Sequence, residues 1–417
     1  MAGPAPPLDL SKPIPLATQA FATHKYAYYE RLRAEAPVCR ARAGFLPIYV
    51  VARHSDCLDL LKDTRFVRNR STATGGGRMP FPTPRSVALL AQSMITEDDP
   101  AHRRLRNLVN QAFTPRAVAR LEPSIRAFTA QALDNLEATA RRHPEREVDL
   151  LRHFAAPIPV AVIGELVGVP RAMMPRFQES VRALTGGLSL WMVLRLFAWD
   201  LRRAIALVRE LVEAKRKDPG DDLLTGLLEA EAEGDRLTED EVVSMVFLLV
   251  VAGFETTTHL IGNGVRTLLQ HPEAWRALRA DPDGWPTAVE EILRFRGPIH
   301  GTKLQYATEE VELAGVKIPK GSAVIPLLGS ANHDPDAFDA PERFDIARHP
   351  NPHLGFSHGN HFCLGAQLAR LETRIALEAL IERFPEARLA PRADALEPQK
   401  MLLWHRYAEM PLTLPAG

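Results

Sequence analysis

The sequence is poor in cysteine. Its 417 residues include only Cys39, Cys57 and Cys363, an odd and sparse set. Such a set excludes a disulfide framework, and no two of these cysteines have the short spacing of a zinc site. A cysteine with a chemical role must therefore act alone in this chain.

The sequence also lacks an excess of charge and a long apolar run. Lys plus Arg and Asp plus Glu each total 51, so no overall field favours nucleic acid or an anionic membrane as a partner. The most apolar stretch, Met245 to Gly253, is about half of the roughly 20 residues that span a bilayer. The proline-rich N-terminus lacks the basic start and apolar core of a signal peptide. We therefore expect a cytoplasmic protein that binds neither nucleic acid nor a membrane.

No internal repeat, low-complexity tract or flexible linker divides the chain, which favours one large domain. We expect a proline-rich arm and first helix over residues 1–36 and a single catalytic domain over residues 37–417. Apolar residues that recur every three and four positions predict helices over most of the chain. Strand signals are few. The expected fold class is therefore mainly α with a small β part. The helices are expected over residues 27–36, 116–142, 288–295 and 367–384, and the short strands over Gly44 to Arg53, Val311 to Pro319 and Ser322 to Leu328.

The longest expected helix starts at Thr238, which forms a capping box with Glu241, and ends near Gln270. Its middle is polar, with Gly253, Glu255 and three threonines in succession. Glycine and β-branched residues weaken a helix, and threonine hydroxyls compete for its carbonyls, so we expect the helix to open locally here. This region is either a tolerated kink or a polar notch built into a buried helix.

Cys363 stands in a glycine-containing loop, HLGFSHGNHFCLGAQLARLE, that leads into an amphipathic helix. A lone cysteine is usually a buried small hydrophobe. At the start of a helix, however, free N–H groups and the positive end of the dipole lower a thiol pKa, and the thiolate then suits a metal. Gly359 and Gly365 leave room for a flat ligand, and His361 is a polar neighbour. From these features alone, a nucleophilic cysteine with His361 as its base remains an alternative.

The pattern Phe356-x-x-Gly359-x-x-x-Cys363-x-Gly365 resembles the haem loop of the cytochrome P-450 family. The resemblance implies a single large, triangular haem-thiolate fold. It also implies a haem b (iron protoporphyrin IX) with Cys363 as the axial thiolate, which favours cleavage of the O–O bond. By the same resemblance Phe356 packs on the sulfur side of the ring, the two glycines let the loop approach it, and His361 meets a propionate.

Three further segments agree with the family in order and spacing. Glu291-x-x-Arg294 resembles the buried pair that supports the haem loop, joined by Arg343 from the PERF segment. The segment from Ile95 to Arg116 resembles the helix that offers a histidine and an arginine to the propionates, here His102 and Arg106. Without the resemblance, these would be an ordinary surface ion pair and a solvated basic face. The notch Ala252-Gly253-x-Glu255-Thr256 resembles the oxygen-binding groove and its acid–alcohol pair.

The chain departs from the family at Gln305, where many relatives carry an arginine for a propionate. If the segment is extended, Lys303 points to the same side as Gln305 and takes over this contact. Otherwise the propionates depend on His102, Arg106 and His361 alone.

The resemblance implies a monooxygenase of secondary metabolism that hydroxylates or epoxidises an apolar substrate with O2 and electrons from NAD(P)H. Thr256 would hold dioxygen or an ordered water, Glu255 would relay protons, and Gly253 would leave room for the ligand. A separate ferredoxin and its reductase would supply the electrons. They would dock on a basic patch formed by Arg103, Arg104, Arg370 and Arg374. The alternative is that these arginines only lie on ordinary solvated helix faces.

By resemblance, apolar side chains line the substrate pocket, which suits a polyketide, a terpenoid or a fatty acid. They are Met94, Ile95, Leu188, Leu190, Trp191, Leu248, Ala252, Ile299, Met401 and Leu402. The loop over residues 71–85 is a candidate lid, and His300 either contacts a substrate oxygen or is a structural histidine. The alternatives are a haem peroxygenase or isomerase, a non-catalytic haem sensor, and a metal-free cysteine hydrolase.

Overall fold

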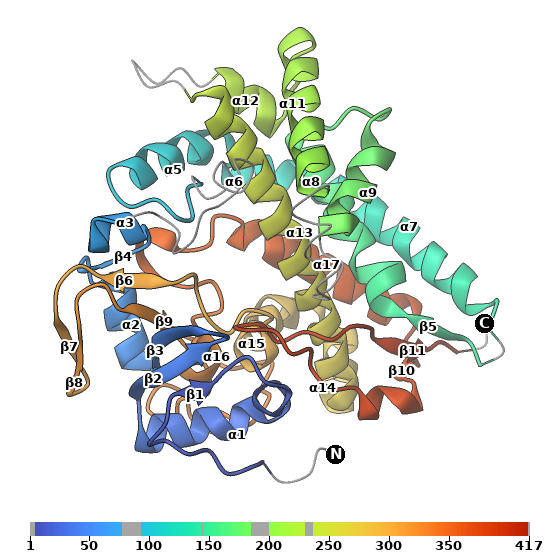
Figure 1. The fold of residues 1–417 in the computed structure, drawn as a ribbon. Coiled ribbons are helices and arrows are strands. Elements are labelled where there is room, and N and C mark those ends of the chain that lie inside the picture. The colour runs from blue at the N-terminus through green and yellow to red at the C-terminus, as the bar shows by residue number, and fades with distance from the viewer. Residues whose placement is uncertain (1–4, 77–92, 144, 185–199, 230–236, 416–417) are drawn as a thin grey trace.

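The computed structural model describes residues 5–76, 93–143, 145–184, 200–229 and 237–415, and helices make up most of it (Figure 1). The longer helices are α1 (Gln19–Glu35), α2 (His54–Lys62), α5 (Ala101–Ala112), α7 (Glu122–Ala140), α8 (Pro157–Val167), α9 (Met174–Leu184), α11 (Leu201–Lys217), α13 (Glu239–Gln270), α14 (Pro272–Ala280), α15 (Trp285–Arg296) and α17 (Ala366–Arg383). Shorter helical segments are α3 (Arg70–Thr74), α6 (Pro115–Arg120), η1 (Leu151–Ala155), α12 (Leu223–Glu229), η3 (Pro282–Gly284), α16 (Leu328–Ala331), η4 (Gly359–His361) and η5 (Pro391–Ala395).

The strands form three small sheets in the described part of the chain. One sheet has the order β1 (Ile14–Pro15), β2 (Val38–Ala43), β3 (Leu46–Val51), β9 (Ala323–Pro326), β6 (Gln305–Ala307) and β4 (Phe66–Val67). A second has the order β10 (Arg388–Leu389), β11 (Pro411–Thr413) and β5 (Glu147–Asp149), and β7 (Val311–Leu313) pairs with β8 (Val316–Ile318). The expected class, mainly α with a small β part, is confirmed.

Helix α13 runs through the middle of the molecule (Figure 1). The predicted capping box is present, since the Thr238 hydroxyl accepts the Glu241 N–H at 3.2 Å and the Glu241 carboxylate accepts the Thr238 N–H at 2.8 Å. Helix α13 is long and apolar enough to span a membrane, but half of its most apolar 18-residue stretch is buried inside the protein. It therefore has the character of a core helix.

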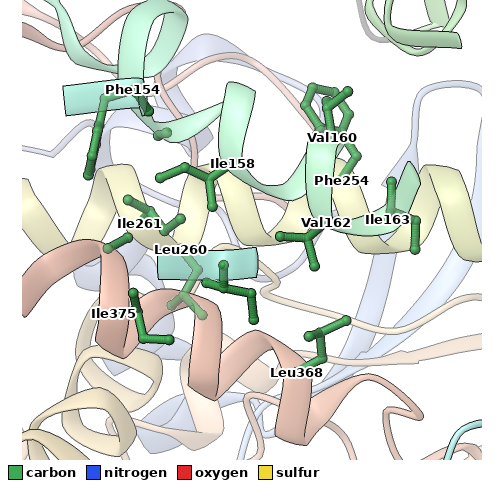
Figure 2. Close-up of a cluster of buried hydrophobic side chains, with 14 of the residues drawn as sticks. Phe154, Ile158, Val160, Val162, Ile163, Phe254, Leu260, Ile261, Leu368 and Ile375 are labelled. Atoms are coloured by element: carbon green, nitrogen blue, oxygen red, sulfur yellow. The ribbon is translucent and has the colours of Figure 1, made fainter. Parts of the chain in front are cut away.

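The core lies where α8 and α17 pack against α13 (Figure 2). Ile158, Val162 and Ile163 of α8 lie along one side of α13, and Leu368 and Ile375 of α17 lie on the other (Figure 2). Because α17 follows directly after the Cys363 loop, this packing fixes that loop relative to the middle of α13.

The predicted elements agree with the structure to different degrees. The strand around Gly44 to Arg53 is β3, and the run from Val311 to Pro319 is a hairpin, β7 and β8, instead of one strand. The long pattern over residues 116–142 divides at Leu121 into α6 and α7. In the N-terminal segment β1 pairs with β2, and Phe21 and Tyr28 of α1 pack on the same sheet, while the division after residue 36 stays a prediction.

Candidate active site

Cys363 ends its loop three residues before α17 begins. Its N–H donates to the Phe356 carbonyl at 3.0 Å, which closes the loop. The residue is exposed, yet enough protein surrounds the sulfur that burial raises the pKa of the thiol. The Gly365 N–H and the charges of Arg106 and Arg370 oppose this effect. Burial thus acts against the expected lowering of the thiol pKa in the free side chain, and Cys363 stands three residues before α17 instead of in its first turn.

The two glycines of the Cys363 loop, Gly359 and Gly365, differ in what surrounds them. Gly359 has a φ of +71°, and a Cβ there would lie 2.7 Å from the Leu61 carbonyl oxygen of α2. Only glycine tolerates this backbone and this approach, so Gly359 serves the packing of the loop on α2. A Cβ at Gly365 would meet no atom within 4 Å. The open space at Gly365, two residues after Cys363, is compatible with the expected flat ligand.

His102, Arg106 and His361 are brought together, as expected. The rings of His102 and His361 lie 4.2 Å apart between centroids. Arg106 donates to the carbonyls of Asn360 at 3.0 Å and Phe362 at 2.7 Å, so α5 holds the Cys363 loop through its backbone.

Both histidines of this pair are uncharged near neutral pH. Burial is the main cause that lowers the pKa of His361 to about 3 and also lowers that of His102. His102 Nε2 is buried without a hydrogen-bond partner in the described part of the chain. No hydrogen bond joins His361 to Cys363 among the described residues, which removes the geometric support for a cysteine nucleophile with a histidine base.

Glu291 and Arg294 form a fully buried pair. Both side chains are 0% exposed. They share two hydrogen bonds of 2.7 Å. Arg294 also donates to the carbonyls of Asn332, Pro341 and Arg343. The pair thus joins α15 to the segment that precedes the Cys363 loop.

The prediction that Arg343 is the third member of this cluster is wrong. Its side chain is 74% exposed and 3.9 Å from Asp345, while its carbonyl faces inward and accepts from Arg294. Arg348 takes the position instead, with Nε 3.2 and 3.1 Å from the two Glu291 oxygens. The chain turns between these two arginines so that only the later guanidinium points at Glu291.

Helix α13 does not open where we expected it to. It is helical from Glu239 to Gln270 without interruption. The Thr256 hydroxyl donates to the Ala252 carbonyl at 2.5 Å, so the threonine bonds within the helix. Ala252 is exposed although α13 crosses the core. A Cβ at Gly253 would lie 3.4 Å from Ile163 of α8, which gives this glycine a packing role.

Glu255 pairs with a residue that the sequence did not indicate. The Arg406 guanidinium bonds the Glu255 carboxylate, and the two side chains are 6% and 15% exposed. Arg406 also lies over the Trp404 ring at 5.5 Å. No local pattern marks Arg406, because the contact joins positions 151 residues apart.

One tertiary contact brings together some of the residues that we expect to line the substrate pocket. The segment at Ile299 pairs with that at Trp404, and the His300 N–H donates to the Leu403 carbonyl at 2.7 Å. Ile299, Met401 and Leu402 therefore come from joined segments, whereas Leu248 and Ala252 lie one turn apart on α13.

The remaining pocket predictions have different outcomes. Met94 is buried and Ile95 half-buried in the turn before α5. Leu188, Leu190, Trp191 and most of the candidate lid lie outside the described residues. His300 is 2% exposed, and its Nδ1 lies 3.2 Å from the Tyr29 hydroxyl, which supports the structural interpretation.

Each arginine of the expected docking patch has an acidic neighbour. Arg103 pairs with Asp99, and Arg104 pairs with Glu241 at the start of α13. Arg370 bonds Glu290 at 2.6 Å and lies over the Phe356 ring at 4.6 Å. Arg374 lies near Glu122 and Glu378. These acids reduce the local excess of positive charge on α5 and α17.

One carboxylate joins the two segments that flank residues 77–92. Asp98 accepts the N–H of Arg68 at 2.6 Å, the N–H of Asn69 at 3.1 Å and the Thr72 hydroxyl at 3.1 Å. Arg68 is itself buried, which no sequence pattern indicated. Gln305 is also buried, whereas Lys303 is exposed and precedes the strand.

Comparison with known proteins agrees with this geometry. The model of the family described as Cytochrome P450 matches residues 6–284 and 286–407. Cytochrome P450 107B1 of Saccharopolyspora erythraea is 39% identical over 405 residues, with 94% of this chain and 96% of that protein covered. The solved structure of PksS, the bacillaene polyketide synthase cytochrome P450 of Bacillus subtilis 168, superposes with a TM-score of 0.87 at 35% identity, covering 96% of this chain and 99% of that one. The structure of P450BioI, solved with a hexadec-9Z-enoic acid ligated acyl carrier protein, superposes with a TM-score of 0.83 at 34% identity. The match covers 95% of this chain and 100% of that one.

Proposed function

Because this chain belongs to the cytochrome P450 family and is a monooxygenase of that family, we propose that it hydroxylates or epoxidises an apolar substrate with electrons from NAD(P)H. The observation that supports the site most directly is the position of Cys363. Cys363 is exposed on a loop that Arg106 holds, two residues before Gly365, where an added Cβ would meet no atom within 4 Å.

The described residues fit the haem b that the family implies. The Cys363 thiolate would hold the iron, and Phe356 would pack beside this residue. The unpartnered Nε2 of buried His102 and the adjoining His361 ring suit a propionate. When bound, haem b supplies the redox chemistry that activates dioxygen.

Two α13 residues control protons near this group. Thr256 holds its hydroxyl on the Ala252 carbonyl, from which it can rotate to donate to dioxygen or to a water. Glu255 is held by Arg406 and passes protons inward from solvent. A relay of this kind distinguishes a monooxygenase from a peroxygenase, an isomerase or a gas sensor.

The substrate is a polyketide or a fatty acyl chain. The expected pocket side chains are almost all apolar, and the names of two relatives point the same way. PksS is described as a polyketide synthase P450, and P450BioI was solved with a fatty-acyl carrier protein. A terpenoid-derived substrate is the alternative, which the apolar pocket also admits. It has support from two other relatives, one named vitamin D(3) 25-hydroxylase and one, CYP109E1, solved with corticosterone.

A ferredoxin and its reductase supply the electrons, in the cytoplasm. The face that carries Arg103 and Arg370 adjoins the Cys363 loop, and its acids leave a weak patch. Reduction by an acidic ferredoxin should therefore slow with salt by a modest factor. A rate independent of salt would contradict docking at this face.

A spectrum of the purified protein tests the whole proposal. The reduced carbonyl complex should show the far-shifted Soret band of thiolate ligation, and Cys363→Ser should lose it. Macrolides and fatty acids are then titrated into the oxidised protein, because substrate that displaces the distal water shifts the iron to high spin. A colourless, folded protein, or no product with NADPH and redox partners, would overturn the proposal.

A further inference from the structure

Arg68, the residue after β4, is a buried cation with an unused donor. It is 8% exposed, and its Nη1 donates to the Thr302 hydroxyl at 3.2 Å and to the Lys303 carbonyl. Its Nε is buried without a hydrogen-bond partner in the described part of the chain. The Asp98 carboxylate accepts the Arg68 backbone N–H, and its charge partly offsets the lowering of the Arg68 pKa by burial, but the guanidinium bonds no carboxylate among the described residues. A buried cation without such a bond is costly, so this site favours an anion.

Arg68 follows the end of a ladder that leads toward Gln305. Phe66 pairs with Ala307 and Val67 with Tyr306 in the antiparallel ladder of β4 and β6, which ends at Val67. One step further in this register would bring position 68 opposite Gln305. Residues opposite each other in such a ladder point to the same face, with Cβ atoms about 4.5–5.5 Å apart. A guanidinium carried by position 68 therefore reaches the region that position 305 would serve. Gln305 is 4% exposed, and its Oε1 has no partner in the described part of the chain.

Asp98 connects Arg68 to the histidine pair. Its carboxylate accepts the Arg68 N–H at 2.6 Å, and its carbonyl accepts the His102 N–H at 2.9 Å. His102 Nε2 is a second buried atom without a partner. The Arg68 Nε–H is the unused charged donor of this group, as a carboxylate needs. His102, whose Nδ1 lies 3.4 Å from the Asp99 carboxylate, would donate through Nε2 only in its protonated form, which a bound carboxylate favours.

We propose that Arg68 binds a haem propionate in place of the arginine that many relatives carry at position 305. The inference rests on the proposed haem site. In this chain the arginine stands directly after the neighbouring strand β4 instead of at position 305, and its guanidinium serves the same carboxylate.

Haem loss from the oxidised holoenzyme to excess apomyoglobin measures this contact. Arg68→Gln should lose haem about tenfold faster, the size expected for one charge-assisted hydrogen bond. Adding Gln305→Arg to that variant should restore most of the retention. Arg65→Gln is the control, since Arg65 is a nearby exposed arginine paired with Asp63, and its rate should equal that of the wild type.

Haem dimethyl ester separates propionate binding from a structural role. Its propionates carry no charge, so wild type and Arg68→Gln reconstituted with the ester should lose it at similar rates. An equal acceleration with haem and with ester would assign Arg68 to holding the Lys303 segment and overturn the inference. Equal rates with haem itself would also overturn it. If the wild type binds no haem, the proposed function fails instead.

Discussion

Arg406 and Glu255 form a nearly buried ion pair between the C-terminal segment and the middle of α13. If Glu255 relays protons, Glu255→Gln and Arg406→Met should each lower kcat by about tenfold or more and raise the solvent isotope effect. The double variant should be no slower than the slower single variant, because the two residues act as a unit.

The control for this pair is Arg392→Met. Arg392 is another arginine of the C-terminal region, and it bonds Glu147 and Glu409 at the surface. Its kcat should match that of the wild type. Additive losses in the double variant would show that Arg406 and Glu255 act separately.

Thr256→Ala should uncouple electron use from product formation, because water and protons then reach the oxygen site without control. Hydrogen peroxide per NADPH should rise severalfold, while the product per NADPH falls. Thr258→Ala is a matched comparison, since the Thr258 hydroxyl makes the same type of bond, to the Phe254 carbonyl at 2.9 Å, but is buried. Unchanged coupling in Thr256→Ala would remove this hydroxyl from the mechanism.

Arg348→Met should destabilise the fold, whereas Arg343→Met should not. Loss of Arg348 leaves the buried Glu291 carboxylate with one fewer cation, which costs about 3 kcal/mol. Arg343 is a surface side chain, whose loss changes stability by about 0.5 kcal/mol or less. Urea midpoints measure both. The opposite order would restore Arg343 to the cluster.

Glu372 should make the protein less stable as the pH rises. The carboxyl lies in α17 at 3% exposure, and burial raises its pKa to about 8. A folded-state pKa above the unfolded value of 4.5 stabilises the fold at low pH, and this stability is lost as pH rises from about 4.5 to about 8. The loss is on the order of 5 kcal/mol, at about 1.36 kcal/mol per unit of the shift from 4.5 to about 8.

The difference in stability between the wild type and Glu372→Gln isolates this contribution. Buried histidines such as His259, whose pKa burial lowers to about 4, change stability in the opposite sense and cancel in the comparison. The variant should gain stability relative to the wild type across this pH range. A difference that does not vary with pH would show that the Glu372 carboxyl is ionised when folded.

The sequence predicts best what is local. The Cys363 loop, the α13 cap and the pairing of Glu291 with Arg294 each occupy a few consecutive residues, and all three are present. The choice between Arg343 and Arg348 depends on a chain turn that no periodicity records. The second sheet escaped prediction because β5, β10 and β11 have two or three residues each and pair across the whole chain.

Arg68 and Arg406 were missed for the same physical reason. No sequence pattern marks either arginine. The role of Arg68 depends on Gln305 and that of Arg406 on Glu255, each far away in the chain. Burial of a charge is visible only after folding. Departures from a family pattern, such as Gln305, are the one sequence signal that points to such a compensating residue.

The contacts of Asp98 have an evolutionary consequence. Its carboxylate ties residues 68–72 to the turn before α5, and its carbonyl accepts the His102 N–H. A substitution at Asp98 would therefore disturb the surroundings of Arg68 and of His102 together. A lineage can vary either segment separately only while this one carboxylate is kept.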